Sequence, residues 1–416
     1  MRIKFKNKKF LILGAGKSGV SAKTFIEKRK GIAEIFDDKE PHDFETSEFN
    51  YVVLSPAITK DHALLAAFTP NQIIPEFMLG LNRGQMRAFA ITGTNGKTTV
   101  SRNLARALGV SACGNIGLPT TSRDTKERKI VCEISSFMLE HSRLSELKFH
   151  PKCAAILNIT QDHLDRHGTM GEYIDCKAFA VKLARKIVLN YDDKNCRKIG
   201  RELKNRKKIT WFSTKSTVRG YFFKNGFIYK NCGRIKKIAD IKDFGAVAAH
   251  DIANILAVLS MAGERKMKRI VKAFDPNEKP RHRGEFVREL NGVSYYNDSK
   301  ATNIGATLAC VNSFSAPIYL LLGGRSKGQD FAELFSKLPK NVIKTYCFGE
   351  SKKQLKKFGC EVCDNMTAAL EKARNDAEET KQNAVVLLSP ACSSLDEFKS
   401  YADRGDLFAQ TVCKFE

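Results

Sequence analysis

Residues 88–100 read AFAITGTNGKTTV, an apolar run that stops at two glycines and restarts as a helix carrying lysine and threonine. Gly93 and Gly96 allow a tight turn that aims backbone N–H groups at a phosphate, and the N-terminal end of the next helix attracts the same negative charge. In such a loop Lys97 meets the outer phosphates and the Thr98 hydroxyl faces a magnesium ion. The stretch therefore predicts a nucleotide-binding loop. It is a shortened variant, because Ile91 stands where the general pattern has a further glycine.

Length and composition place the chain among globular proteins with several domains. Its 416 residues predict about three domains at roughly 150 residues each, and its apolar content of 43% is ordinary. We find no run of about 18 apolar residues that could span a bilayer. The basic first ten residues lead into an apolar strand without the cleavage site of a signal peptide. We therefore expect a cytoplasmic protein that does not bind membranes and acts as a monomer.

The cysteines and the charge suggest neither a metal centre nor a nucleic-acid partner. The 12 cysteines are scattered through apolar segments, which predicts reduced thiols in the cores. Cys360 and Cys363 form one C-x-x-C pair, but a zinc site needs a second pair and only Cys347 is near in sequence. The net charge of +25 permits binding to nucleic acid. Lysine and arginine nevertheless occur throughout the chain without a recognition motif, so a basic nucleic-acid-binding ATPase is kept only as an alternative.

The first 83 residues predict a Rossmann-like domain. An apolar strand at 10–13 enters GAGKSG at 14–19, and a helix and a short strand at 33–36 follow, ending at Asp37 and Asp38. A G-x-G-x-x-G turn with an acidic residue about 20 positions later is typical of dinucleotide folds, of which NAD binding is one use. A further strand at 51–54 ends in a loop that begins at Ser55. Such loops at the carboxyl ends of strands are where open α/β sheets bind ligands.

Residues 84–279 predict a central domain around the nucleotide-binding loop. Glu133 ends an apolar strand, where a carboxylate is costly unless it holds a cation, so it is a magnesium candidate. A second apolar strand delivers the polar segment 160–167, in which His163 is a candidate ligand. Asn225-Gly226 between two aromatic strands predicts a β-hairpin. The helix that opens near His250 carries polar residues that either face a ligand or cap the helix.

Residues 280–416 predict a second doubly wound domain. Two prolines at 276 and 280 mark a linker, after which strands and helices alternate to the end of the chain. Polar loops follow three of these strands, near residues 297–300, 323–327 and 389–394. The expected architecture is thus α/β in three domains, with Rossmann-like domains on either side of a central P-loop domain.

Six ordered motifs together resemble the Mur ligase family over nearly the whole chain. They are TGTNGKTT at 92–99, EISSFMLE at 133–140, LNITQDHLDRH at 157–167, YNDSKATN at 296–303, LLLGGRSKGQDF at 320–331 and LLSPACSSLDEF at 387–398. The last three resemble the members that add D-glutamate more closely than the tripeptide-adding members or folylpolyglutamate synthase, which share mainly the ATP site. Another amino-acid ligase of the same superfamily is the alternative.

The resemblance implies a reaction and two kinds of substrate site. ATP would phosphorylate the free carboxylate of UDP-N-acetylmuramoyl-L-alanine, and the amine of D-glutamate would displace phosphate from the acyl phosphate. Such chemistry depends on aligning and neutralising anions. The resemblance also changes the expected ligand of the first domain from NAD to a uridine nucleotide.

The resemblance assigns residues to each part of that reaction. The catalytic residues would be Lys97, Glu133, His163 and Lys177, and two Mg²⁺ ions would be held by Thr98, Glu133, His163 and a carbamylated Lys177. By sequence alone, Lys177 looks like an ordinary lysine on a helix face. ATP would contact Gly93, Thr94, Asn95, Gly96, Lys97, Thr98, Thr99, Asn254, Arg283, Asp298 and Lys300. The UDP substrate would contact Gly14, Ala15, Gly16, Lys17, Ser18, Asp37, Asp38, Ser55, Asn115 and Ser135. D-Glutamate would contact Thr302, Lys327, Ser394 and Tyr401.

The chain departs from the family pattern at three positions. Asp251 replaces an asparagine near the expected adenine contact, Ala57 replaces a glycine, and Tyr401 stands where phenylalanine is common. None of these departures removes a group that the chemistry needs.

Overall fold

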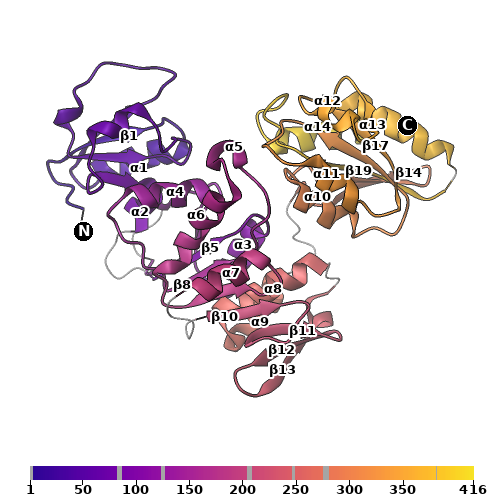
Figure 1. Ribbon diagram of the computed structural model, residues 1–416, viewed down its shortest axis with the longest axis horizontal. Helices are drawn as coiled ribbons and strands as arrows, with labels where there is room; N and C mark the ends of the chain where they lie inside the picture. Colours follow the sequence, from indigo (N-terminus) through magenta and orange to yellow (C-terminus); the bar gives the residue numbers. More distant parts are fainter. Residues whose placement is uncertain are drawn as a thin grey trace. The chain divides into compact units, whose positions relative to one another are not determined.

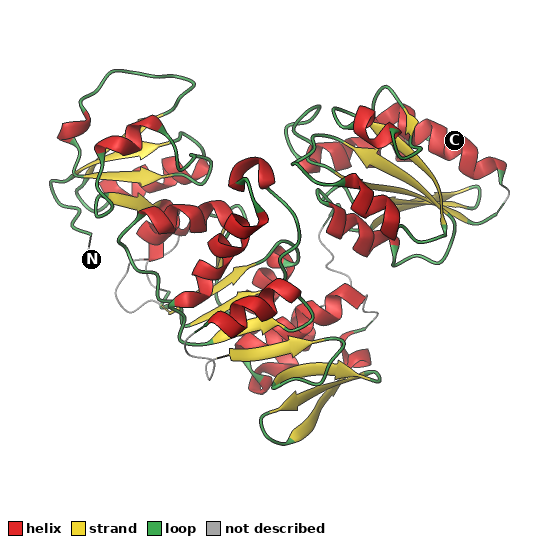
Figure 2. Ribbon diagram, in the orientation of Figure 1, coloured by secondary structure: helices red, strands yellow, loops and turns green. Residues whose placement is uncertain are grey.

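The computed structural model describes residues 3–81, 87–122, 127–203, 209–245, 249–274, 281–380 and 382–416. They form three β-sheets with helices packed on them, which confirms the predicted α/β class (Figures 1 and 2). The chain divides into two compact units, each described here by itself. The first unit holds Met1–Ile159, Gly171–Val247 and Asp251–Asp275, and the second holds Thr160–Met170, Ala248–His250 and Pro276–Glu416.

The first sheet is built from the N-terminal residues and is entirely parallel, in the order β2-β1-β3-β4. Its interior strands are apolar on both faces, as expected for a parallel sheet covered by helices. The elements are β1 (Lys9–Leu13), α1 (Lys17–Glu27), β2 (Ile32–Phe36), β3 (Tyr51–Leu54), β4 (Ile73–Pro75) and α2 (Glu76–Leu81). The predicted βαβ unit with its glycine turn is confirmed.

The second sheet has nine strands in the order β13-β12-β11-β10-β9-β8-β5-β7-β6 and belongs to the same unit. It is parallel from β6 to β11, whereas β12 and β13 are antiparallel additions. The strands are β5 (Arg87–Thr92), β6 (Ala112–Gly114), β7 (Lys129–Glu133), β8 (Cys153–Ile156), β9 (Ile187–Asn190), β10 (Ile209–Ser213), β11 (Gly220–Lys224), β12 (Phe227–Asn231) and β13 (Ile235–Asp240). The helices are α3 (Lys97–Leu108), α4 (Ser136–Leu144), α6 (Met170–Lys182), α7 (Lys194–Glu202), α8 (Ala249–Ala262) and α9 (Met267–Ala273).

One apolar core joins this sheet to its covering helices. Phe89 and Ile91 of β5 pack with Leu104 of α3, Ile255 of α8 and Ile270 of α9. The predicted hairpin is also confirmed, since β11 and β12 pair antiparallel across Asn225 and Gly226, whose φ angles are 49° and 82°. Positive φ at both turn residues is the requirement that the Asn-Gly pair meets.

The third sheet lies in the second unit, in the order β14-β15-β19-β16-β17-β18. Only β14 is antiparallel to its neighbour, so the predicted strand and helix alternation gives a doubly wound sheet with one added edge strand. The strands are β14 (Glu285–Leu290), β15 (Val293–Asn297), β16 (Ile318–Gly323), β17 (Val342–Phe348), β18 (Glu361–Val362) and β19 (Ala384–Ala391). The helices are α5 (Leu164–His167), α10 (Ile304–Val311), α11 (Phe331–Lys337), α12 (Lys352–Lys356), α13 (Met366–Glu379) and α14 (Tyr401–Cys413).

The predicted domain boundaries at residues 83 and 279 lie outside the described residues, and the three-domain ranges stay predictions. The strands of each sheet nevertheless come from one continuous stretch of sequence. Among the described helices, none is long and apolar enough to cross a membrane. The expectation of a monomer also stays a prediction.

The glycine turn of the first sheet yields a test with a matched control. A Cβ on Gly19 would overlap the carbonyl oxygen of Gly14, whereas a Cβ on Gly16 would meet nothing within 4 Å. We expect Gly19→Ala to lower the free energy of unfolding by about 2–3 kcal/mol, because the backbone must shift. Gly16→Ala should cost less than about 1 kcal/mol. Thermal unfolding of both variants measures the difference, and equal costs would contradict this account of the turn.

Candidate active site

The predicted nucleotide-binding loop has the backbone that a phosphate site needs. Gly96 adopts φ 83° immediately before α3, and a Cβ there would lie 2.7 Å from Asn254 Oδ1. Gly93 is similarly restricted, since its Cβ would lie 3.1 Å from the Cβ of Leu157. The Lys97 ammonium donates hydrogen bonds of 2.8 Å to the carbonyl oxygens of Gly93 and Thr94. The Lys97 side chain therefore folds back along its own loop, which leads into the N-terminal end of α3.

Asn158 holds this loop in shape, although the sequence did not single it out as a site residue. Its Oδ1 accepts from the Asn95 N–H at 2.8 Å, and its Nδ2 donates to the Asn95 carbonyl at 3.1 Å. The Asn158 carbonyl also accepts from the Thr94 N–H at 2.9 Å. In the sequence, the one indication of a role for Asn158 is its position just after the strand β8. Only the sheet order, which places β8 beside β5, connects it to the loop.

Lys177 lies against the same loop from α6. The side chain is 1% exposed, its Nζ donates to the Gly93 carbonyl at 3.0 Å, and it lies 4.4 Å from the ring centre of Tyr173. The Tyr173 hydroxyl in turn lies 3.2 Å from the Thr94 Oγ1. The interpretation of Lys177 as an ordinary lysine on a helix face is therefore wrong, because the side chain is buried. It is buried because α6 packs this face toward the loop, which a local sequence pattern does not reveal.

Glu133 provides a buried carboxylate whose two oxygens differ. Its Oε1 accepts from Asn115 Nδ2 at 2.9 Å, whereas its Oε2 has no hydrogen-bond partner among the residues that the structure describes. Glu133 is 1% exposed, so the unpaired oxygen is costly unless a cation satisfies it. Carboxylate oxygen is also a ligand that Mg²⁺ prefers. The residue therefore fits the magnesium role that was predicted for it.

The remaining predicted metal ligands are distributed over both units. Thr98 follows Lys97 in the first turn of α3, and Lys177 lies in the same unit, whereas His163 lies in the second unit. His163 has a left-handed backbone, with φ 55°, immediately before α5. Within the described ranges, no group of three or more His, Cys, Asp or Glu side chains could hold a metal ion by itself. Ser135, predicted near the muramoyl substrate, caps α4 by accepting from the Met138 N–H at 3.2 Å.

The N-terminal glycine turn is exposed at residues 15–17 and is fixed by an acidic residue. The Ala15 N–H donates to Asp37 Oδ2 at 2.8 Å, and this bond lowers the pKa of Asp37. The Ser55 hydroxyl donates to the Gly14 carbonyl at 3.2 Å, and Asp38 lies 3.1 Å from the ring of His62. The structure thus brings Asp37, Ser55 and the turn together at the carboxyl ends of the strands. Gly16 precedes α1, and Lys17 and Ser18 form its first turn.

In the second unit, a carboxylate that the prediction did not include joins several predicted residues. Asp162 is 5% exposed and accepts from Lys327 Nζ at 3.1 Å and from Asn303 Nδ2 at 3.3 Å. Lys327 also lies 3.4 Å from the Thr302 hydroxyl. Lys327 and Thr302 therefore lie together, and Asp162 bonds to Lys327 and to Asn303, the residue after Thr302. Asp162 adjoins His163 in a quoted motif, but its partners come from two distant loops.

Arg404 organises the loops that carry the other predicted residues of this unit. It is fully buried, and its guanidinium donates to the carbonyl oxygens of Ser299, Gly323 and Cys392 at 2.9, 3.3 and 3.1 Å. These carbonyls lie at or directly after the carboxyl ends of β15, β16 and β19. Burial lowers the pKa of Arg404 to about 10. Sequence reasoning missed this residue because a single arginine in a helix gives no signal of burial.

Tyr401 and Lys300 meet at the start of α14. Lys300 Nζ donates to the Tyr401 hydroxyl at 3.2 Å and lies 4.9 Å from the centre of its ring. The Ser299 hydroxyl donates to the Tyr401 carbonyl at 2.8 Å, which fixes the helix start. Ser394 is buried at 2% exposure in the neighbouring loop.

Asp298 is a buried carboxyl beside the segment that contains Arg283. Its oxygens accept from the Ser389 hydroxyl at 2.8 Å and from the Gly284 N–H at 3.2 Å. Burial raises the pKa of Asp298 to about 6, although these hydrogen bonds and the positive charge of Arg283 oppose the shift. Two predicted ATP-contacting residues are therefore adjacent within this unit.

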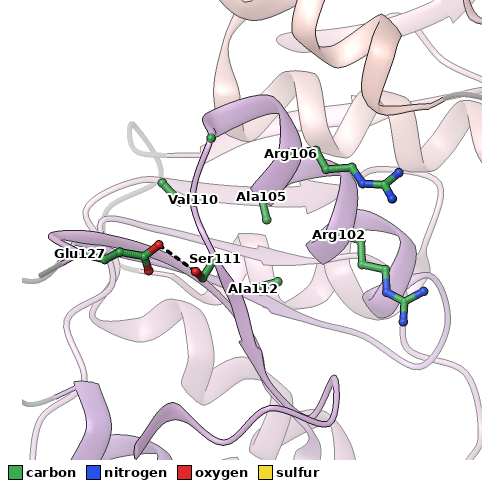
Figure 3. A pocket seen from close by; sticks show the side chains of 8 residues that line it. Arg102, Ala105, Arg106, Val110, Ser111, Ala112 and Glu127 are labelled. Atoms are coloured by element: carbon green, nitrogen blue, oxygen red, sulfur yellow. Dashed lines mark hydrogen bonds between the residues drawn. The ribbon is translucent and has the colours of Figure 1, made fainter. Parts of the chain in front are cut away.

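A surface cavity elsewhere in the first unit does not involve the predicted residues. It has a volume of about 500 Å³ and is lined by Arg102, Ala105, Arg106, Gly109, Val110, Ser111, Ala112 and Glu127. Figure 3 shows the two arginines on α3 and, across the cavity, the hydrogen bond of 2.7 Å from Ser111 to Glu127. All 12 cysteines are free thiols, in keeping with the prediction from sequence.

The raised pKa of Asp298 gives a pH dependence of stability. The folded chain keeps this proton up to about pH 6, whereas the usual value is 3.8, so the group favours folding most below pH 3.8 and progressively less as the pH rises to about 6. The wild type loses this contribution as the pH rises from about 4 to about 7, whereas Asp298→Asn stays uncharged. We therefore expect the free energy of unfolding of Asp298→Asn, relative to that of the wild type, to increase by about 2–3 kcal/mol across this pH range. Urea unfolding at several pH values measures this difference. The exposed Asp330→Asn is the control, and a difference that does not vary with pH would contradict the assignment.

Comparison with known proteins agrees with the geometry. A family model for the Mur ligase middle domain matches residues 91–262, and one for the Mur ligase glutamate ligase domain matches residues 282–392. UDP-N-acetylmuramoylalanine–D-glutamate ligase of Caldicellulosiruptor saccharolyticus is 35% identical over 97% of this chain and 98% of its own. The protein of that name from a Thermoanaerobacter species is 33% identical over 99% of both chains.

Solved structures show the same fold at lower identity. UDP-N-acetylmuramate–alanine ligase of Thermotoga maritima is 16% identical, with a TM-score of 0.58 over 98% of this chain and 99% of its own. MurF of Acinetobacter baumannii is 14% identical, with a TM-score of 0.60 over 98% of this chain and 92% of its own. The two family models and the relatives that match almost end to end show that this chain belongs to the Mur ligase family, among its UDP-N-acetylmuramoylalanine–D-glutamate ligases.

Proposed function

We propose that the chain joins D-glutamate to UDP-N-acetylmuramoyl-L-alanine with hydrolysis of ATP, in the synthesis of peptidoglycan precursors. The observation that carries the proposal is the half-buried glycine-rich loop, where Lys97 and Lys177 both bond to the Gly93 carbonyl. Similarity to D-glutamate ligases over 97% of the chain supports this choice of substrates. One solved structure of the same fold is a MurF ligase of Thermotoga maritima in complex with ADP, which supports the use of ATP.

The first step transfers the outer phosphoryl group of ATP. A carboxylate oxygen of the muramoyl-alanine attacks the γ-phosphorus, the bond to the ADP oxygen breaks, and an acyl phosphate forms. The N–H groups of the loop and Lys97 would hold the phosphates in line for this attack, because phosphoryl transfer depends on position and charge. Asn254 would lie beside the nucleotide, since its side chain is already against Gly96.

Magnesium fits the residues that are present. Thr98, Glu133, His163 and Lys177 as its carbamate would hold the ions, and the unpaired Oε2 of Glu133 supports the fit. When bound, Mg²⁺ would offset the negative charge of the phosphates. Carbamylation would convert the Lys177 ammonium, which points at Gly93, into an anionic oxygen ligand. Arg283, Asp298 and Lys300 would provide the remaining contacts to ATP.

The second step forms the amide bond. The amine of D-glutamate attacks the acyl carbon, phosphate leaves, and the nitrogen loses a proton. Lys327 would bind a carboxylate of the amino acid in place of its present partner Asp162, 3.1 Å away. Thr302, Ser394 and Tyr401 would complete the amino-acid site. The UDP part of the other substrate would bind the turn at residues 14–18 with Asp37, Asp38 and Ser55, and Asn115 and Ser135 would contact its muramoyl-alanine part.

Phosphate release measured with each substrate omitted tests the proposed reaction. We expect full turnover only when ATP, UDP-N-acetylmuramoyl-L-alanine and D-glutamate are all present. L-Glutamate or L-lysine in place of D-glutamate should lower kcat/KM by at least about tenfold, because L-glutamate misplaces a carboxylate and L-lysine replaces one with an ammonium group. Ready use of L-lysine would favour another Mur-type ligase. Phosphate release that needs neither substrate, or that RNA stimulates, would contradict the proposal.

The two ends of α3 provide a matched test of the phosphate loop. Gly96 and Gly109 both have left-handed backbones, with φ 83° and 65°, so alanine strains both by about 1–2 kcal/mol. Only the Cβ at position 96 meets Asn254, while the one at 109 lies 3.6 Å from the end of the Arg269 side chain. We expect Gly96→Ala to weaken ATP binding at least about tenfold and Gly109→Ala to change it by less than about twofold. Calorimetric titration with ATP decides, and equal losses would place the phosphates elsewhere.

A further inference from the structure

Glu76 is a buried carboxyl that the proposed mechanism does not use. It begins α2 and is 2% exposed, and burial raises its pKa to about 7. Its Oε1 accepts from the Thr121 hydroxyl at 2.6 Å and the Thr121 N–H at 3.3 Å, and it lies 3.4 Å from the Thr120 hydroxyl. Among the described residues, Glu76 forms no ion pair. A carboxyl in such a place is expensive, and its compensation here comes from one short segment.

That segment is residues 114–122, here called the strap, which runs from the end of β6 to a short 3₁₀ helix at Thr120–Ser122. At its first end, the Asn115 N–H donates to the Glu133 carbonyl and Asn115 Nδ2 donates to Glu133 Oε1, both at 2.9 Å. A bond of 2.7 Å from the Gly114 N–H to the Leu118 carbonyl closes the turn between. The strap therefore holds the carboxylate that is proposed to bind magnesium.

The other end of the strap is fixed to the N-terminal elements. The Thr121 hydroxyl lies 2.8 Å from the Ser21 hydroxyl on α1, the helix that begins at the glycine turn of residues 14–19. The Thr120 hydroxyl donates to the Phe77 carbonyl at 3.0 Å. A Cβ on Gly80 would overlap the backbone of Thr120, so α2 and the strap are in direct backbone contact. Glu76 lies at this junction and binds both threonines.

We propose that Glu76 is a positioning residue that, through the strap, sets Asn115 and Glu133 relative to the glycine turn that receives the UDP part of the substrate. This inference rests on the proposed function, because it takes the turn, Asn115 and Glu133 as parts of one substrate site. An apolar side chain could fill the volume, but it could not accept from the Thr121 N–H and hydroxyl. The acceptor oxygen, rather than the charge, is therefore what the position requires.

Steady-state kinetics of the full chain separates positioning from stability. We expect Glu76→Ala to raise the KM for UDP-N-acetylmuramoyl-L-alanine about 5–10-fold, while the KM for D-glutamate changes by less than about twofold. Glu76→Gln keeps the acceptor oxygen and should restore both values to within about twofold of the wild type. The control is Val53→Ala, in the buried strand β3, which should lower stability but leave both KM values unchanged. A Glu76→Ala variant with an unchanged KM for the UDP substrate, or with equal rises in both KM values, would overturn the proposal.

Backbone hydrogen exchange gives a readout that does not depend on ligase activity. We expect amides of residues 114–122 to exchange at least about fivefold faster in Glu76→Ala than in the wild type, and near the wild-type rate in Glu76→Gln and Val53→Ala. Unchanged exchange in Glu76→Ala would overturn the role of Glu76 in holding the strap. A wild-type chain that does not ligate these substrates would instead overturn the proposed function, and the exchange rates would still decide whether Glu76 holds the strap.

Discussion

The Gly93 carbonyl is the point on which the geometry of the glycine-rich loop before α3 depends. It accepts from two ammonium groups, Lys97 of α3 and Lys177 of α6, at 2.8 and 3.0 Å. Both bonds require the loop to keep its left-handed turn at Gly96, and Asn158 and Asn254 pack against that turn from other elements. A loop so constrained presents its N–H groups without further ordering, which is the condition for efficient phosphoryl transfer.

Both units contain buried ionisable groups where loops pack together, and each group has a different set of hydrogen-bond partners. Arg404 donates to carbonyl oxygens at the ends of three strands, and Asp298 accepts from a hydroxyl and a backbone N–H. Glu76 has two threonines of one segment. Glu133 alone among these four keeps a buried oxygen without a hydrogen bond within the described part of the chain. The first three groups hold loops in place, whereas Glu133 has a coordination position to offer.

The predicted residues that the structure joins most closely are those on loops after strands of one parallel sheet. Thr302 and Lys327 follow β15 and β16, which flank β19, and their side chains lie 3.4 Å apart. Asp162 accepts from Lys327 and from Asn303, the residue after Thr302. Parallel strands bring their carboxyl ends to one edge, so polar loops far apart in sequence meet there. This rule allowed the sequence to place candidate residues at strand ends without any knowledge of their contacts.

The sequence by itself determined the α/β class, the glycine turns, the Asn-Gly hairpin and the phosphate loop, because each depends on backbone rules and periodicity within a few residues. Its motifs also carried the family and most candidate residues, including Lys177, whose burial no local pattern predicts. Only the tertiary structure decided which side chains lie inside and what they contact. Asn158, Asp162, Arg404 and Glu76 escaped notice because hydrogen bonding and desolvation are set by neighbours from distant strands and loops.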